Sequence, residues 1–145
     1  MSTTLFDESL WPLLVIHFSG IPTSEEFEAY LSRRLDYLRR YERHAIVYDT
    51  RRVRLLPAEM RTRHVVWTRE HEALRREMLV ANAIVITSPV IRLTLNLALH
   101  AMRDDVPYFV APTLSEAALW AADRLRDVGH PIPAERIRRH FETSS

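Results

Sequence analysis

Short, continuous apolar runs alternate with longer segments of helical periodicity along most of the chain. The runs at residues 13–18, 45–48, 83–87 and 107–110 contain few charged side chains. Continuous runs of this length are typical of strands that are buried on both faces of a parallel sheet. Residues 3–6 form a weaker run, which predicts an edge strand at the N-terminal side of the sheet.

Segments with apolar residues at helical spacing separate these runs. The pattern predicts helices at residues 23–43, 57–80, 113–129 and 134–141. Thr23 with Glu26, and Thr113 with Glu116, match the capping box, in which two side chains satisfy the free amides of a first helical turn. We expect Gly129 to end the helix that precedes it.

Residues 91–100 fit two different elements. Apolar side chains at every second position follow the periodicity of a strand, whereas the abundance of Leu and Ala favours a helix. Ser88 and Pro89 supply a helix cap and a suitable first helical residue. We therefore expect a helix here, one that is apolar on more than one side.

The order of these elements predicts a single α/β domain of 145 residues. We expect a four- to five-stranded, mostly parallel sheet with an antiparallel N-terminal edge strand, flanked by four to five helices. Residues 131–145 would form a short C-terminal helical extension.

The composition of the chain excludes several classes of partner and of functional site. The formal net charge is +1, so bulk electrostatics do not attract the chain to nucleic acid or to an anionic membrane. The chain contains no cysteine, which excludes disulfides, thiolate nucleophiles and cysteine-based zinc sites. No apolar run is long enough for a signal or a membrane span, and we expect a cytoplasmic location, no integral membrane association and no nucleic-acid partner.

The chain resembles the SpoIIAA-like superfamily, which includes the STAS domains of anti-sigma-factor antagonists and the CRAL-TRIO-like lipid-binding fold. The resemblance spans roughly residues 10–125 and implies a SpoIIAA-like fold and a non-enzymatic domain that contacts another protein or binds a small ligand. It is carried by Trp11-Pro12 before residues 13–18, residues 45–49, Val85-Ile86-Thr87-Ser88-Pro89 with Arg92, Tyr108-Phe109-Val110, and Glu116-Ala117-Ala118-Leu119-Trp120.

One feature of the STAS antagonists is missing. They carry a phosphorylatable Ser or Thr where the second central helix begins, and this chain has Leu55-Leu56-Pro57-Ala58-Glu59-Met60 there. Thr50 lies several residues too early and Thr62 one turn too late. We therefore expect no phosphorylation switch at that place.

No catalytic or metal-binding pattern stands out. His64 and His71 are two helical turns apart, about 10 Å along a helix axis, which is too far to share one metal ion. No Gly-x-Ser-x-Gly elbow is present. We expect no catalytic residues, no metal and no cofactor, and interpret the histidines as partly buried or interfacial.

The best small-ligand candidates lie where strands end. In open parallel sheets, ligands bind beyond the carboxyl ends of the strands, and the free amides of a following helix attract anions. The residues are Asp49, Thr50, Thr87, Ser88 and Arg92. The alternative is structural, with Ser88 as a helix cap and Arg92 in a local ion pair.

Two sets of residues are candidates for partner binding. The densest basic segment contains Arg51, Arg52, Arg54, Arg61 and Arg63, and it is either a docking patch for an acidic partner or an ordinary solvated surface. Leu93, Leu97 and His100 would form a homodimer or partner interface, or else lie buried under the C-terminal helix.

Taken together, these patterns favour a regulatory or scaffolding protein-interaction domain that binds another protein and also itself. The alternative function is a small-molecule or lipid-binding module at the strand ends near Asp49 and Ser88–Arg92.

Overall fold

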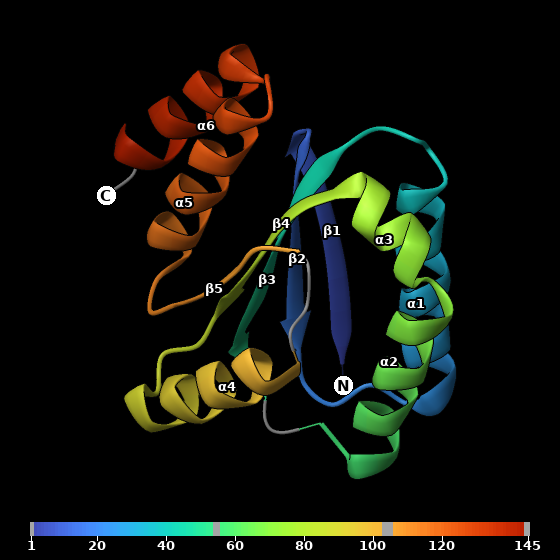
Figure 1. The fold of residues 1–145 in the computed structure, drawn as a ribbon. Helices are drawn as coiled ribbons and strands as arrows, with labels where there is room; N and C mark the ends of the chain where they lie inside the picture. Colours follow the sequence, from blue (N-terminus) through green and yellow to red (C-terminus); the bar gives the residue numbers. More distant parts are fainter. Residues whose placement is uncertain (1, 54–55, 103–105, 144–145) are drawn as a thin grey trace.

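A five-stranded sheet lies at the centre of the computed structural model, which describes residues 2–53, 56–102 and 106–143 (Figure 1). The strands lie side by side in the order of the sequence. β1 is antiparallel to β2, and all the other neighbours are parallel. The α/β class, the mostly parallel sheet and the antiparallel edge strand are thus confirmed. The strands are β1 (Thr3–Leu10), β2 (Leu13–Ser19), β3 (His44–Arg52), β4 (Leu79–Val85) and β5 (Tyr108–Ala111).

Helices cover both faces of this sheet (Figure 1). One face, here called the α1 face, packs against α1, α2 and α3. The opposite face, the α5 face, packs against α5 and α6. The helices are α1 (Ser24–Leu38), α2 (Ala58–Glu70), α3 (Glu72–Met78), α4 (Pro89–Met102), α5 (Leu114–Asp127) and α6 (Pro131–Thr143).

On the α5 face, small side chains bring helix and sheet close together. Four fully buried alanines of α5 meet the strands: Ala117, Ala118, Ala121 and Ala122. Helix α6 completes this layer with Ile137, which is also fully buried. The C-terminal segment is therefore part of the core and packs on α5.

On the α1 face, larger side chains fill the space between the helices and the sheet. Leu14 and Ile16 of β2 pack in the same buried cluster as Leu31 of α1 and Trp67 of α2. Helix α1 presents its apolar stripe as predicted, because residues three and four positions apart share one face of a helix. Each sheet face thus has its own core.

Helix boundaries follow local hydrogen bonds. The predicted capping box at α1 is confirmed, because Glu26 N–H donates to Thr23 Oγ1 at 3.2 Å and Thr23 N–H donates to Glu26 Oε1 at 2.8 Å. At α5 only the first half forms, with Glu116 N–H donating to Thr113 Oγ1 at 3.1 Å. Helix α1 ends at Leu38, earlier than predicted, and Tyr41 at φ 56° turns the chain toward β3.

The predicted second helix was too long. It breaks at His71 into α2 and α3, and β4 begins at Leu79, so Leu79 and Val80 belong to the sheet. The predicted helix after Pro89 is confirmed as α4. The break explains why the described part of the chain holds six helices instead of four to five. None of the described helices has the length and apolar character needed to span a membrane.

Candidate functional site

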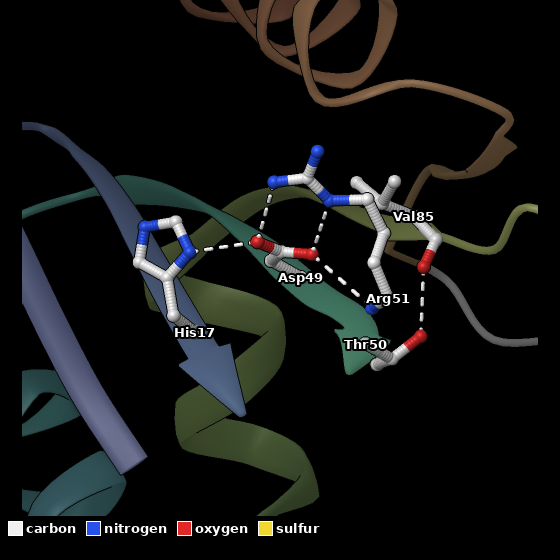
Figure 2. A network of polar contacts seen from close by, with 5 residues as sticks. All are labelled: His17, Asp49, Thr50, Arg51 and Val85. Carbon is white, nitrogen blue, oxygen red and sulfur yellow. Dashed lines mark hydrogen bonds and ion pairs between the residues drawn. The ribbon is translucent and has the colours of Figure 1, made fainter. Parts of the chain in front are cut away.

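Asp49, near the carboxyl end of β3, is held by two basic side chains from neighbouring positions (Figure 2). Arg51 Nε donates to Asp49 Oδ1 at 2.8 Å and Arg51 Nη2 donates to Oδ2 at 2.9 Å. His17 lies opposite Asp49 in the parallel register of β2 and β3, and its Nδ1 lies 2.7 Å from Oδ2. Both carboxylate oxygens therefore have donors, although Asp49 is only 7% exposed.

The electrostatics of this group follow from its partners. Burial has the largest single effect on Asp49 and would raise its pKa. The hydrogen bonds from Arg51 and His17 together outweigh burial and bring the pKa to about 2. The carboxylate is thus ionised at neutral pH and can only accept hydrogen bonds. His17 must therefore carry a proton on Nδ1, which leaves Nε2 as the second nitrogen of an oriented ring.

A cavity of about 100 Å³ adjoins His17 on the α5 face. Asp7 and Ser9 of β1 line it, together with His140 of α6. The hydroxyl and the backbone N–H of Ser9 both donate to Asp7, the latter at 2.9 Å, and these bonds lower the pKa of Asp7. The Ser9 hydroxyl is thus directed to a carboxylate. Among the residues with a described placement, no three His, Asp or Glu side chains are arranged to hold a metal ion.

The neighbouring candidate Thr50 faces the other side of the sheet. Its hydroxyl donates to the Val85 carbonyl at 2.7 Å, which joins β3 to β4 (Figure 2). Because successive side chains of a strand point to opposite faces, Asp49 and Thr50 cannot bind the same ligand from one side. The Thr50 side chain thus links the carboxyl ends of β3 and β4 by a hydrogen bond.

The ligand-binding candidates that follow β4 lie at the N-terminus of α4, apart from Asp49. Ile91 N–H donates to Ser88 Oγ at 3.3 Å, so Ser88 caps α4. Arg92 Nη1 donates to the carbonyls of Ile86 at 2.8 Å and Thr87 at 2.9 Å. The Arg92 side chain thus binds backbone carbonyls of its own chain. The local ion pair that was expected as the alternative is replaced by these hydrogen bonds. The ligand-binding role of these residues stays a prediction.

The arginine segment divides into different environments. Arg51, Arg52 and Arg61 are all exposed, and Arg51 is paired with Asp49. Arg54 lies outside the described residues. Arg63 holds both carboxylate oxygens of Glu28, at 2.9 and 3.0 Å. The exposure of Arg51, Arg52 and Arg61 is compatible with docking, and the docking role of this segment stays a prediction.

Helix α4 lies at the carboxyl end of the sheet (Figure 1), and several of its apolar side chains are exposed. Val90 is 74% exposed, Ile91 56%, Leu93 62% and Leu97 65%. Val90, Leu93 and Leu97 share one side of the helix, and we call these three residues the α4 face; Ile91 lies toward the side of Leu95 and Leu99. His100 is exposed as well, whereas Leu95 and Leu99 are half-buried. The alternative of burial under the C-terminal helix is wrong, because α6 packs on α5 and β1.

A buried basic cluster on the α1 face escaped the sequence analysis. Arg34 of α1 and Arg75 of α3 are 2% and 6% exposed. Burial and the positive charges of these two arginines lower the pKa of His64 to about 4, so His64 is neutral at pH 7. The spacing held a signal, because Arg34 follows Leu31 and precedes Leu38 in the apolar stripe of α1.

Comparison with known proteins identifies the fold. No protein-family model matches the sequence, and no curated protein is similar to it. An uncharacterized protein of the DUF3478 family from Shewanella loihica, described as having a SpoIIAA-like fold, is similar in structure with a TM-score of 0.65. Its identity is 12%, over 83% of this chain and 93% of that one. An anti-sigma factor antagonist from Mycobacterium paratuberculosis has a TM-score of 0.56 and 20% identity, over 83% of this chain and 94% of that one.

The chain is therefore an α/β protein with one antiparallel edge strand and helices on both sheet faces. More specifically, it has the SpoIIAA-like fold that the sequence resemblance implied. At these identities the likeness defines the fold, and function must be argued from the chain's own residues.

Proposed function

We propose that this chain is a non-catalytic protein-interaction domain, and that two copies associate through the α4 face. The exposure of its three aliphatic side chains, each more than half exposed, carries this proposal. Burying a whole Val, Leu or Ile side chain contributes about 1.5–3 kcal/mol. Covering the exposed portions of all three would therefore contribute roughly 3–6 kcal/mol per copy.

The charge of α4 favours a second copy as the occupant. The helix contains no acidic residue, and its one arginine, Arg92, donates to backbone carbonyls of the same molecule. In a twofold interface the same surface of both copies is in contact, so a cluster of like charges on it would lie opposite the same charges of the other copy and repel them. An uncharged surface avoids that repulsion, whereas partners of different sequence commonly recognise each other through complementary charges.

The comparisons support a protein-binding role in general terms. One structural neighbour is by name an antagonist of an anti-sigma factor, which is itself a protein. We extend this to a regulatory or scaffolding role for the present chain. Arg52 and Arg61 would then serve a further, acidic partner, and the strand-end ligand site near Asp49 and Ser88 remains the alternative.

The oligomeric state tests the proposal. Light scattering coupled to size-exclusion chromatography at micromolar concentration is expected to give twice the chain mass of 17.0 kDa. Leu93→Asp and Leu97→Asp should each give the single-chain mass. Ile132→Asp is the matched control, because Ile132 is 82% exposed on α6, and it should leave the dimer intact.

Circular dichroism of each variant verifies that the fold is retained. A wild-type protein that stays a single chain at hundreds of micromolar would exclude a second copy as the occupant. A dimer that persists in both α4 variants would place the interface elsewhere.

A further inference from the structure

Arg34 lies in an aromatic enclosure between α1, the sheet and α2. Its guanidinium carbon is 4.7 Å from the Trp67 ring centre, 5.2 Å from that of Tyr48 and 6.0 Å from that of Tyr30. Rings at these distances attract a cation through their π faces. They accept few hydrogen bonds, however, so the N–H groups of a buried guanidinium still need acceptors.

Two of these N–H groups have no acceptor. Arg34 is 2% exposed, and neither its Nε nor its Nη2 has a hydrogen-bond partner among the described residues. Arg51 and Arg63 use the same two atoms to hold both oxygens of a carboxylate, that of Asp49 and that of Glu28. Arg34 presents this planar, side-on donor pair in the interior, where a charge is normally paired and hydrogen-bonded.

The surroundings of Arg34 supply further positive potential. The charge of Arg75 acts on both Tyr30 and His64. His64 is neutral at pH 7, because burial and the two arginines lower its pKa to about 4. Besides burial, the groups that act on Arg34 are the phenol groups of Tyr48 and of Tyr30, and Tyr30 also makes a side-chain hydrogen bond to it. No carboxylate of the described residues acts on Arg34, so a negative charge is the missing component.

A surface hollow lies near this enclosure, between the N-terminal parts of α1 and α2. It measures about 80 Å³, and Phe27 and Met60 line it together with the charged side chains of Glu28, Glu59 and Arg63. Both residues belong to the buried cluster that contains Trp67, and the Phe27 ring lies 5.8 Å from the Tyr30 ring. The buried rings of Phe27 and Tyr30 thus lie between the hollow and Arg34. A ligand reaches Arg34 only if α2 moves outward, and this helix buries only Met60 and Trp67 among its 13 residues.

We infer that Arg34 is the binding site for the carboxylate of a small aromatic or aliphatic acid. The two oxygens accept from Nε and Nη2, and the apolar part of the acid lies along the seam between α1 and α2 toward Phe27. The rings of Tyr30, Tyr48 and Trp67 form the walls. This site is separate from the α4 face, so an experiment can contradict the carboxylate site without contradicting the proposed dimer, and the reverse.

Titration with benzoate and octanoate tests the site, with benzamide as the uncharged analogue and inorganic phosphate as the competing anion. The Nε–H resonance of Arg34 in labelled protein is expected to shift with either acid at millimolar concentration or below, and the thermal midpoint should rise. Benzamide and phosphate should cause neither change.

Variants link the effect to the guanidinium. Arg34→Met, which keeps length and removes the charge, should weaken benzoate binding at least about tenfold, since one charged hydrogen bond is worth that much or more. Arg34→Lys keeps the charge without the paired donors and should also weaken it, which provides the test if the Met variant does not fold. Arg33→Met is the control, because Arg33 is exposed on the same helix.

Several results would overturn the assignment. No shift with either acid would leave Arg34 as a purely structural cation among aromatic rings. Equal binding of benzamide, binding of phosphate alone, or wild-type affinity in Arg34→Lys would each contradict a carboxylate held by the side-on pair.

Discussion

Replacing Asp49 by Asn measures how much the carboxylate at the end of β3 contributes to folding. Asn preserves the shape of the side chain and removes its charge, so Arg51 loses a two-point partner and His17 loses its acceptor oxygen. The pKa of Asp49 is about 2, against an ordinary value of 3.8. At 1.36 kcal/mol per pH unit, this difference corresponds to about 2 kcal/mol of folding free energy.

The sign of the pH dependence follows from the direction of this difference. Because folding lowers the pKa, the unfolded chain takes up a proton at a higher pH than the folded one. The stabilisation is therefore complete above pH 4 and is lost as the pH falls from about 4 to 2. Asp49→Asn should cost about 2 kcal/mol at pH 7, and the gap to wild type should narrow toward pH 2.

Urea unfolding followed by circular dichroism at a series of pH values gives these free energies. Asp127→Asn is the matched control, since the Asp127 side chain is 51% exposed in its pair with Arg124 and an exposed pair contributes less than about 1 kcal/mol. Equal stability of Asp49→Asn and wild type at pH 7 would refute the reasoning. So would a difference of full size that persists at pH 2.

Other consequences can be checked with the same equipment. Ile137→Ala should cost about 2–5 kcal/mol in urea unfolding, because Ile137 is fully buried where α6 meets the core; a cost below 1 kcal/mol would show that α6 is dispensable. Thr23→Ala should cost about 1 kcal/mol through the loss of the α1 cap, and Thr23→Ser should restore most of it. Burial lowers the pKa of His44 to about 4, so its ring should stay neutral from pH 7 down to about 4 in NMR titration, and stability should fall between pH 6.5 and 4; protonation near pH 6.5 would contradict its burial.

The architecture was predictable because its signals are local. The run at residues 13–18 became β2 (Leu13–Ser19), and the Thr23 capping box placed the start of α1 within one residue. Local patterns did not predict the boundary of an element where that boundary depends on pairing with a residue far away in the sequence. Leu79 and Val80 extend the apolar stripe of the preceding helix, yet they lie in β4, because Leu79 pairs with His44 of β3.

The candidate site was predictable only in its place along the chain. Strand ends indicated Asp49 and Thr50, but the direction of each side chain and the partner His17, 32 residues away, depend on register. The buried state of Arg34 was missed for a different reason. An arginine inside an apolar stripe is normally solvated at its tip, and only the arrangement of Tyr48 and Trp67 around it shows that it is enclosed.

The exposure of the α4 face is a property of the sequence itself. Successive helical residues are 100° apart, so leucines at every second position fall alternately on opposite sides of the helix. Leu93 and Leu97 lie on one side of the helix, and Leu95 and Leu99 lie on the other. In the structure Leu95 and Leu99 are each half-buried, whereas Leu93 and Leu97 are exposed. Rotating α4 about its axis would exchange the two pairs without hiding both. A helix with this pattern therefore needs a second contact surface in any fold that covers one side only, which is why we assign the uncovered side to another copy of the chain.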